Sequence, residues 1–263
     1  MKTFETAGPV EVSVECSAGE VRVATADAPR AEVEVTALRN DDVSREAAAG
    51  TLVELRDDRL VVEVPKRSDW LLGREPKVKV EVRVPHDSAL SFTTASADVA
   101  ADGRLAAVRG RTASGDVRVS DAQTVRLESA SGDLRVESVR GEAGLRSASG
   151  DIDLGTVAGP VEASVVSGDL RVRAAAGAAT LSAVSGDVSL GSVAGDVEVR
   201  TVSGDATVGV PRGTRVHVDV STVSGDLRSE VELDEAPGGG GDGPLVEVRG
   251  RTVSGDFSIS RVS

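Results

Sequence analysis

One tripeptide, Ser-Gly-Asp, supplies most of the residues whose type and spacing could do chemistry in this sequence. It occurs eight times, and the successive spacings are 17, 18, 18, 18, 18, 21 and 30 residues. Carboxylate oxygens that recur at a regular spacing are suitable ligands for a hard cation such as Ca²⁺. The candidate calcium column consists of Asp116, Asp133, Asp151, Asp169, Asp187 and Asp205.

The same tripeptide also has a structural interpretation, which we favour. Glycine supplies the positive φ that tight turns require, and Ser and Asp side chains hydrogen-bond nearby backbone groups. Stacked aspartates about 5 Å apart would repel by roughly 0.8 kcal/mol in water, and we expect Arg118, Arg135 and Arg171 to relieve part of this. The predicted turn glycines are Gly115, Gly132, Gly150, Gly168, Gly186, Gly204, Gly225 and Gly255.

Calcium binding remains the first alternative, as a calcium-binding β-roll. Such rolls carry Gly-Gly-x-Gly-x-Asp turns, whereas Gly and Asp are adjacent here and the alternate turns mostly lack carboxylates. About six to eight oxygen ligands per ion would be hard to assemble from them. We therefore predict no metal site and no cofactor.

Catalytic chemistry has little support in the residue types. The only histidines are His86 and His217, in different parts of the chain, and no nucleophile motif surrounds any serine. The chain has no Tyr and one Trp, so it lacks the aromatic platforms typical of sugar sites. We expect a protein that is not an enzyme.

A nine-residue period lies inside the 18-residue repeat. In residues 185–202 the apolar residues Val188, Leu190 and Val193 are followed nine residues later by Val197, Val199 and Val202. Each half predicts a turn, a short strand with two inward-facing residues and an apolar corner.

The two periods together predict an all-β protein. The expected fold is a parallel β-solenoid with about 18 residues per coil and two nine-residue half-coils. An antiparallel meander of nine residues per strand and turn is the alternative, and the hand of the coil stays open.

The domain organisation follows the repeat. Residues 1–95 are expected to form irregular β coils with insertions, continuous with a regular Ser-Gly-Asp solenoid over residues 96–263. A short helix is predicted from Asp42 to Ala49, closed by Gly50. The loop 66–76, which contains Trp70, is interpreted as a lid, and the glycine-rich run 234–244 as a flexible loop. Phe257 and Ile259 are expected to close the C-terminal end.

Composition excludes several classes of protein. The 43 acidic and 30 basic residues give a net charge of −13, which argues against a nucleic-acid binder. Cys16 is the only cysteine, so there is no intramolecular disulfide, and we expect a small buried thiol. The absence of a leader-like segment and of any apolar run near 20 residues predicts a cytoplasmic protein without a membrane span.

The motif Thr/Ser-Ala/Val-Ser-Gly-Asp-apolar-x-apolar resembles a large bacterial family of β-strand-repeat domains of unknown function, often labelled "putative adhesin". The resemblance covers residues 95–263 clearly. It implies a β-solenoid without known catalytic residues, so none is carried over to this chain. Some relatives are associated with the cell envelope and its stress responses, but no leader or anchor is found in this sequence.

The sequence therefore predicts a non-enzymatic interaction scaffold that binds an unknown protein partner and no nucleic acid. Its expected state is a monomer or a weak end-to-end homo-oligomer. An envelope-associated adhesin or stress-response protein is the second alternative, after the calcium-binding β-roll.

Overall fold

The computed structural model describes residues 1–65, 75–230 and 245–262, which form two compact units, residues 1–132 and 133–263. Each unit is described by itself. The predicted lid around Trp70 and the glycine-rich loop 234–244 lie outside the described residues, apart from residues 75 and 76. In the described part of the chain, no helix has the length and apolarity needed to cross a membrane.

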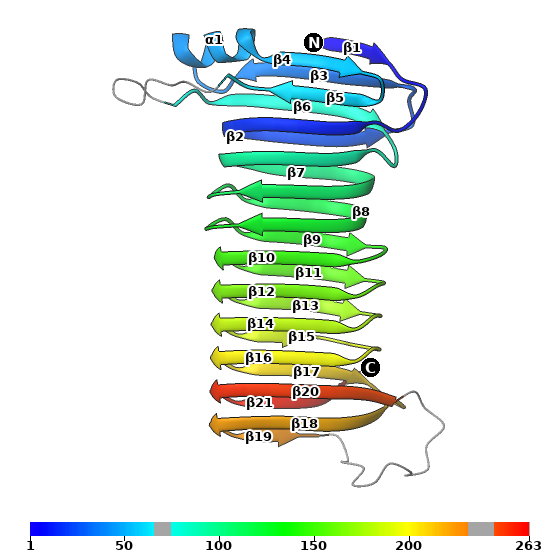
Figure 1. Cartoon of the computed structure of the whole chain (residues 1–263), viewed down its shortest axis with the longest axis vertical. Helices are drawn as coiled ribbons and strands as arrows, with labels where there is room; N and C mark the ends of the chain where they lie inside the picture. The colour runs from blue at the N-terminus through cyan, green and yellow to red at the C-terminus, as the bar shows by residue number, and fades with distance from the viewer. Residues whose placement is uncertain (66–74, 231–244, 263) are drawn as a thin grey trace. The chain divides into compact units, whose positions relative to one another are not determined.

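The strands of residues 133–263 form two parallel stacks (Figure 1). In spatial order, the first stack contains β10 (Ala143–Ser149), β12 (Val161–Ser167), β14 (Ala179–Ser185), β16 (Val197–Ser203), β20 (Leu245–Ser254) and β18 (Arg215–Ser224). The second contains β9 (Leu134–Val139), β11 (Ile152–Val157), β13 (Leu170–Ala175), β15 (Val188–Leu190), β17 (Ala206–Pro211), β21 (Phe257–Val262) and β19 (Leu227–Ser229).

The register confirms the predicted β-solenoid. Residues 18 apart are paired in parallel, as Ala143 with Val161 and Ile152 with Leu170. Each 18-residue coil thus contributes one strand to each stack, and the antiparallel meander is wrong for these repeats. Inward-facing Leu145 is fully buried, because the alternation of Val, Leu and Ala with polar residues directs one side of each strand into the core.

The two half-coils differ at their third apolar position. Val157 is 3% exposed, but Val166, nine residues later, is 51% exposed. In β11 the alternation breaks at buried Gly155, and Val157 faces inward. In β12 the alternation continues as far as Val166, so Val165 faces inward and Val166 outward. The predicted apolar corner is therefore wrong for the second half-coil.

The last two coils are stacked out of chain order. Strand β20 lies between β16 and β18, with Ser254 in register with both Ser203 and Ser224, and β21 lies between β17 and β19. Phe257 and Ile259 are each 1% exposed. The expectation that they close the end is wrong, because β18 and β19 occupy that position.

Arg261 binds the connection between β17 and β18. At this connection the chain skips the coil position that β20 and β21 occupy. From β21 its Nη1 donates to the carbonyl oxygens of Pro211 and Thr214, at 3.0 and 2.7 Å. Pro211 is the last residue of β17 and Thr214 directly precedes β18, so Arg261 binds both ends of the turn that connects these strands.

Residues 1–132 combine parallel coils with antiparallel strands. The elements are β1 (Lys2–Glu5), β2 (Glu11–Ala26), β3 (Arg30–Ala37), α1 (Asp42–Gly50), β4 (Leu52–Arg56), β5 (Arg59–Glu63), β6 (Val78–Pro85), β7 (Ala89–Thr112) and β8 (Val117–Ser129). The long strand β2 pairs in parallel with β5, β6 and β7, and β7 with β8. Strands β1–β3, β3–β6 and β4–β5 are antiparallel.

Helix α1 begins where the sequence predicts a helix. The N–H of Ser44 donates to the Asp41 carboxylate at 2.7 Å, which caps the helix. The pKa of that carboxyl is lowered, first by a hydrogen bond from the Ser44 side chain and then by this N–H. Gly50 is its last residue, and the predicted helix is confirmed.

Two phenylalanines enter the narrow cores only opposite glycine. A Cβ on Gly110 would lie 2.0 Å from Cζ of Phe92, and a Cβ on Gly250 would lie 2.5 Å from Cε2 of Phe257. Phe92 is 4% exposed and Phe257 is 1% exposed. The low aromatic content therefore reflects the space available at each level of the core.

Gly110→Ala is expected to destabilise the protein by about 1–3 kcal/mol, because the added methyl overpacks the core against the Phe92 ring. Urea unfolding followed by circular dichroism measures the change. Gly8→Ala is the matched control, since its Cβ would meet nothing within 4 Å. Adding Phe92→Leu to Gly110→Ala should recover part of the loss, and a Gly110→Ala protein as stable as the wild type would contradict the packing argument.

Candidate functional site

The Ser-Gly-Asp turns stack so that each aspartate binds the next coil. In residues 133–263 the backbone N–H of Asp151 donates to Oδ1 of Asp133 at 3.0 Å, and that of Asp169 donates to Oδ1 of Asp151 at 2.9 Å. The ladder continues through Asp187, Asp205, Asp256 and Asp226, in the spatial order of the coils. In residues 1–132 the N–H of Asp116 donates to Oδ1 of Asp98, at 3.0 Å. Five of the six carboxylates of the candidate calcium column thus accept backbone N–H groups: Asp133, Asp151, Asp169, Asp187 and Asp205.

Glycine is required in these turns mainly because the backbone of the neighbouring turn lies very close to it. A Cβ on Gly186 would lie 2.0 Å from the carbonyl oxygen of Gly168, and the φ of Gly186 is +135°. Gly132 lacks a positive φ, yet its Cβ would lie 2.1 Å from the carbonyl oxygen of Gly115. The backbone of one turn therefore occupies the space that any side chain on the next would need.

A hydroxyl two residues before the serine fixes several of these turns. The N–H of Gly115 donates to Oγ1 of Thr112 at 2.9 Å, and that hydroxyl lies 3.2 Å from the Gly115 carbonyl oxygen. Ser129 contacts Gly132 in the same way. Both residues are buried, and the turn backbone supplies the hydrogen-bond partners that their hydroxyls need. The same bonds hold the turn backbone in place.

Arginines balance part of the charge of the aspartate ladder. Arg135 lies 3.2 Å from the Asp133 carboxylate, and Arg171 lies 2.6 Å from that of Asp169. Arg118, which was expected to do the same, makes no ion pair within the described ranges. These arginines are exposed, so the pairs shield charge more than they add stability.

The described residues contain no group of three or more His, Cys, Asp or Glu side chains arranged to hold a metal ion. The two histidines belong to different units. His86 Nδ1 lies 2.8 Å from Oγ1 of Thr25, whereas His217 is exposed on β18. The structure therefore brings neither of them to the Ser-Gly-Asp turns.

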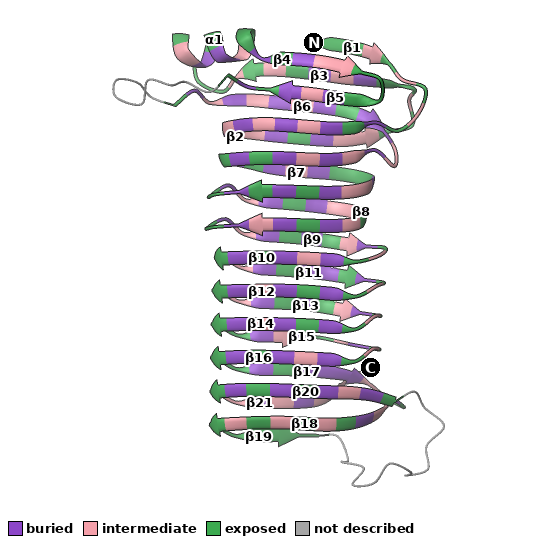
Figure 2. Ribbon diagram, in the orientation of Figure 1, coloured by how far each residue is buried: buried purple, intermediate pink, exposed green. Residues whose placement is uncertain are grey.

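A row of exposed valines is the surface that the sequence analysis missed. We call it the valine stripe; in spatial order it consists of Val166, Val184, Val202, Val253 and Val223. The first four are 47–51% exposed and Val223 is 81% exposed. Figure 2 shows the exposed tips of the strands that carry them. The signal was present as a valine before each of these serines, but the nine-residue period assigned that position to the core.

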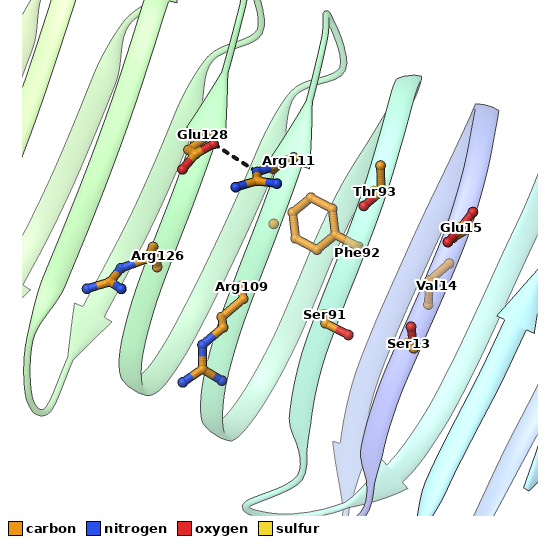
Figure 3. A pocket seen from close by; sticks show the side chains of 11 residues that line it. Ser13, Val14, Glu15, Ser91, Phe92, Thr93, Arg109, Arg111, Arg126 and Glu128 are labelled. Carbon is orange, nitrogen blue, oxygen red and sulfur yellow. Dashed lines mark hydrogen bonds and ion pairs between the residues drawn. The ribbon is translucent and has the colours of Figure 1, made fainter.

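A depression of about 290 Å³ lies on residues 1–132 (Figure 3). Its charged lining is Glu15, Arg109, Arg111, Arg126 and Glu128, and Arg111 donates to Glu128 at 2.9 Å. Arg109 and Arg126 are in register on β7 and β8. The lining contains no His or Cys, and its Arg111 and Glu128 are paired with each other.

Cys16 is a buried thiol, as expected. It is 1% exposed, and its Sγ lies 3.5 Å from the carbonyl oxygen of Ala18. Burial raises the pKa of this thiol to about 11, and the backbone of Ala18 opposes this rise only in part. A protonated, covered sulfur is a poor nucleophile.

The fold is a parallel β-solenoid, and the family comparison agrees with it. The family described as Toastrack DUF4097 matches residues 10–192. The chain belongs to the Toastrack DUF4097 family. The sequence matches none of the curated proteins.

Several solved structures resemble this chain over nearly its whole length. A "putative adhesin" from Bacteroides fragilis is 12% identical with a TM-score of 0.47, and the match covers 99% of this chain and 95% of that one. A "putative adhesin" from Parabacteroides distasonis is 15% identical with a TM-score of 0.42, with the same coverage of both chains. A "putative lipid binding protein" from Parabacteroides distasonis is 12% identical with a TM-score of 0.44, covering 100% and 96%. At this level of likeness these names carry no argument about binding.

Asp169→Ala is expected to cost about 0.5–1.5 kcal/mol of unfolding free energy, because the N–H of Asp187 loses its acceptor. Asp169→Asn keeps an acceptor oxygen and should cost less than half as much. Thermal and urea unfolding compare the two variants with the wild type. An Asn variant as unstable as the Ala variant would show that the charge matters, and not the acceptor.

The thiol of Cys16 should make stability fall at alkaline pH. Its folded pKa of about 11 lies above the ordinary value of roughly 8.5. Between these values the unfolded state loses the proton while the folded state keeps it, so this contribution to stability is full below roughly pH 8.5 and declines as pH rises. Urea unfolding at pH 8 and pH 10 should show a larger decline for the wild type than for Cys16→Ala, and equal declines would contradict it.

Proposed function

We propose that this protein is a non-enzymatic interaction scaffold, and that the valine stripe is its contact surface for a protein partner. The observation that carries the proposal is the repetition of one half-exposed valine per coil over five successive coils. Soluble proteins rarely expose contiguous apolar rows without using them in recognition.

The geometry of the stripe suits an extended partner. Coils in a parallel stack are about 4.8 Å apart, so the valines form a straight ladder. Beside each valine stands an exposed serine, namely Ser167, Ser185, Ser203, Ser254 and Ser224 in the same order. An apolar row with a polar margin is the common arrangement of a protein contact surface.

The turns beneath the stripe keep it rigid. The aspartate ladder and the glycine stacking fix the backbone on the C-terminal side of each valine. A surface that is already ordered loses little conformational entropy on binding. A scaffold role also fits a family without known catalytic residues, and we propose on the same grounds that the protein is not an enzyme.

Replacing Val166, Val184 and Val202 by Thr tests the proposal. Threonine keeps the β-branched shape and strand propensity but adds a hydroxyl to the surface. Affinity capture from the native host, with quantitative mass spectrometry, should show at least about a tenfold loss of bound partner, about 1.4 kcal/mol.

The matched control is the double variant Leu38→Thr and Leu52→Thr. These leucines of the first unit are 45% and 41% exposed, so the control removes exposed apolar surface elsewhere. It should capture the partner as the wild type does. The stripe is rejected as the contact surface if the triple variant captures as much partner as the wild type does. It is also rejected if the control variant loses as much partner as the triple variant does.

The cellular location remains a proposal. We propose a cytoplasmic protein, and cell fractionation tests this against the envelope-associated adhesin.

A melting experiment with millimolar calcium tests the calcium-binding β-roll, which predicts a rise in Tm.

A further inference from the structure

The coil formed by β18 and β19 has an uncovered side. Each of its strands pairs with one neighbour, β20 or β21, and within the described ranges no strand lies on its other side. Leu227 is 49% exposed, whereas Phe257, its register partner in the covered coil, is 1% exposed. Val218 is half-buried, whereas its register partner Val248 is fully buried. The core is therefore open at this coil, and β18 presents unpaired backbone groups.

Strand β18 has a charge pattern that can complement itself. Its outward-facing row contains His217 and Asp219, two residues apart, between the inward-facing Val216, Val218 and Val220. The side chains of His217 and Asp219 make no hydrogen bond or ion pair in the described part of the chain. Their register neighbours on β20, Glu247 and Arg249, are paired with each other at 2.7 Å.

We propose that this edge binds a second copy of the chain, with the two β18 strands antiparallel about a two-fold axis. A two-fold axis brings the same edge of both copies together and closes the assembly as a dimer. It joins the two open cores and pairs the free backbone groups of both strands.

Charge complementarity selects the register. With the axis at Asp219, the two Asp219 carboxylates would be directly opposite and would repel. With the axis at His217, the two histidines would be opposite each other, and Asp219 would face Arg215, which already interacts within its own chain. With the axis at Val218, His217 of each copy lies opposite Asp219 of the other, which gives two symmetric pairs. Val216 then lies opposite Val220 of the second copy, so the apolar row also matches.

The dimer should be weak and concentration-dependent. The contact comprises one strand of 10 residues and one of three from each copy, which is small beside the interfaces of stable complexes. Sedimentation velocity from micromolar to near-millimolar protein should show the mass doubling. A chain that stays monomeric throughout this range overturns the proposal.

Two charge variants test the register at pH 6. His217→Asp and Asp219→Lys each place like charges opposite one another and should weaken self-association at least about tenfold. When the two variants are mixed, the introduced aspartate of one faces the introduced lysine of the other, and the unchanged Asp219 faces the unchanged His217. The mixed dimer should therefore form. Melting curves check that each variant is folded, and a mixture no tighter than its components overturns the register.

Cysteine cross-linking locates the axis independently of charge. In a Cys16→Ala background, Val218→Cys should form an intermolecular disulfide, because residues directly opposite on antiparallel strands are within disulfide reach. Val220→Cys is the matched control, since its counterpart on the second copy lies about 13 Å away along the strand. Faster cross-linking of Val220→Cys overturns the register. If dimerisation is lost in the triple valine variant but kept in His217→Asp, the dimer interface is the valine stripe. That result overturns the proposal that the β18 edge forms the dimer.

Discussion

The close approach of successive Ser-Gly-Asp turns is the constraint on which the regular coils depend. The carbonyl oxygen of one glycine lies where the next glycine would carry a Cβ, as Gly168 does for Gly186. At that separation the Asp169 carboxylate reaches the N–H of Asp187. The same contact fixes the pitch of both strand stacks, and with it the packing of the Val, Leu and Ala core.

The narrow core explains both the composition and the exceptions to it. Each level has room for small aliphatic side chains, and a phenylalanine fits only where a glycine faces it, as Gly250 faces Phe257. The fixed strand lengths also put Val166 and its equivalents outside. The buried core and the exposed valines therefore follow from the same geometry, because alternating residues of a strand face opposite sides of the sheet.

The aspartates show how a repeated acidic motif can be structural. In the ladder, Oδ1 of each carboxylate accepts a backbone N–H, and exposed arginines such as Arg171 face the other oxygen. A column of carboxylates in a sequence therefore does not by itself indicate a cation site. The partner of the motif is the backbone of the next coil, which only the stacked structure brings within reach.

The sequence alone determined the coil length, the turn positions and the buried state of Cys16, because each follows from a period or from a local residue preference. It favoured parallel stacking but left the antiparallel meander open. Three features required the tertiary structure. The third apolar position is buried in β11, where the alternation breaks, and exposed in β12, where it continues through Val166. The insertion of β20 and β21 next to β18 and β19 depends on long-range pairing, which carries no local signal. The open edge of β18 follows from that insertion, since chain order would have placed Phe257 at the end.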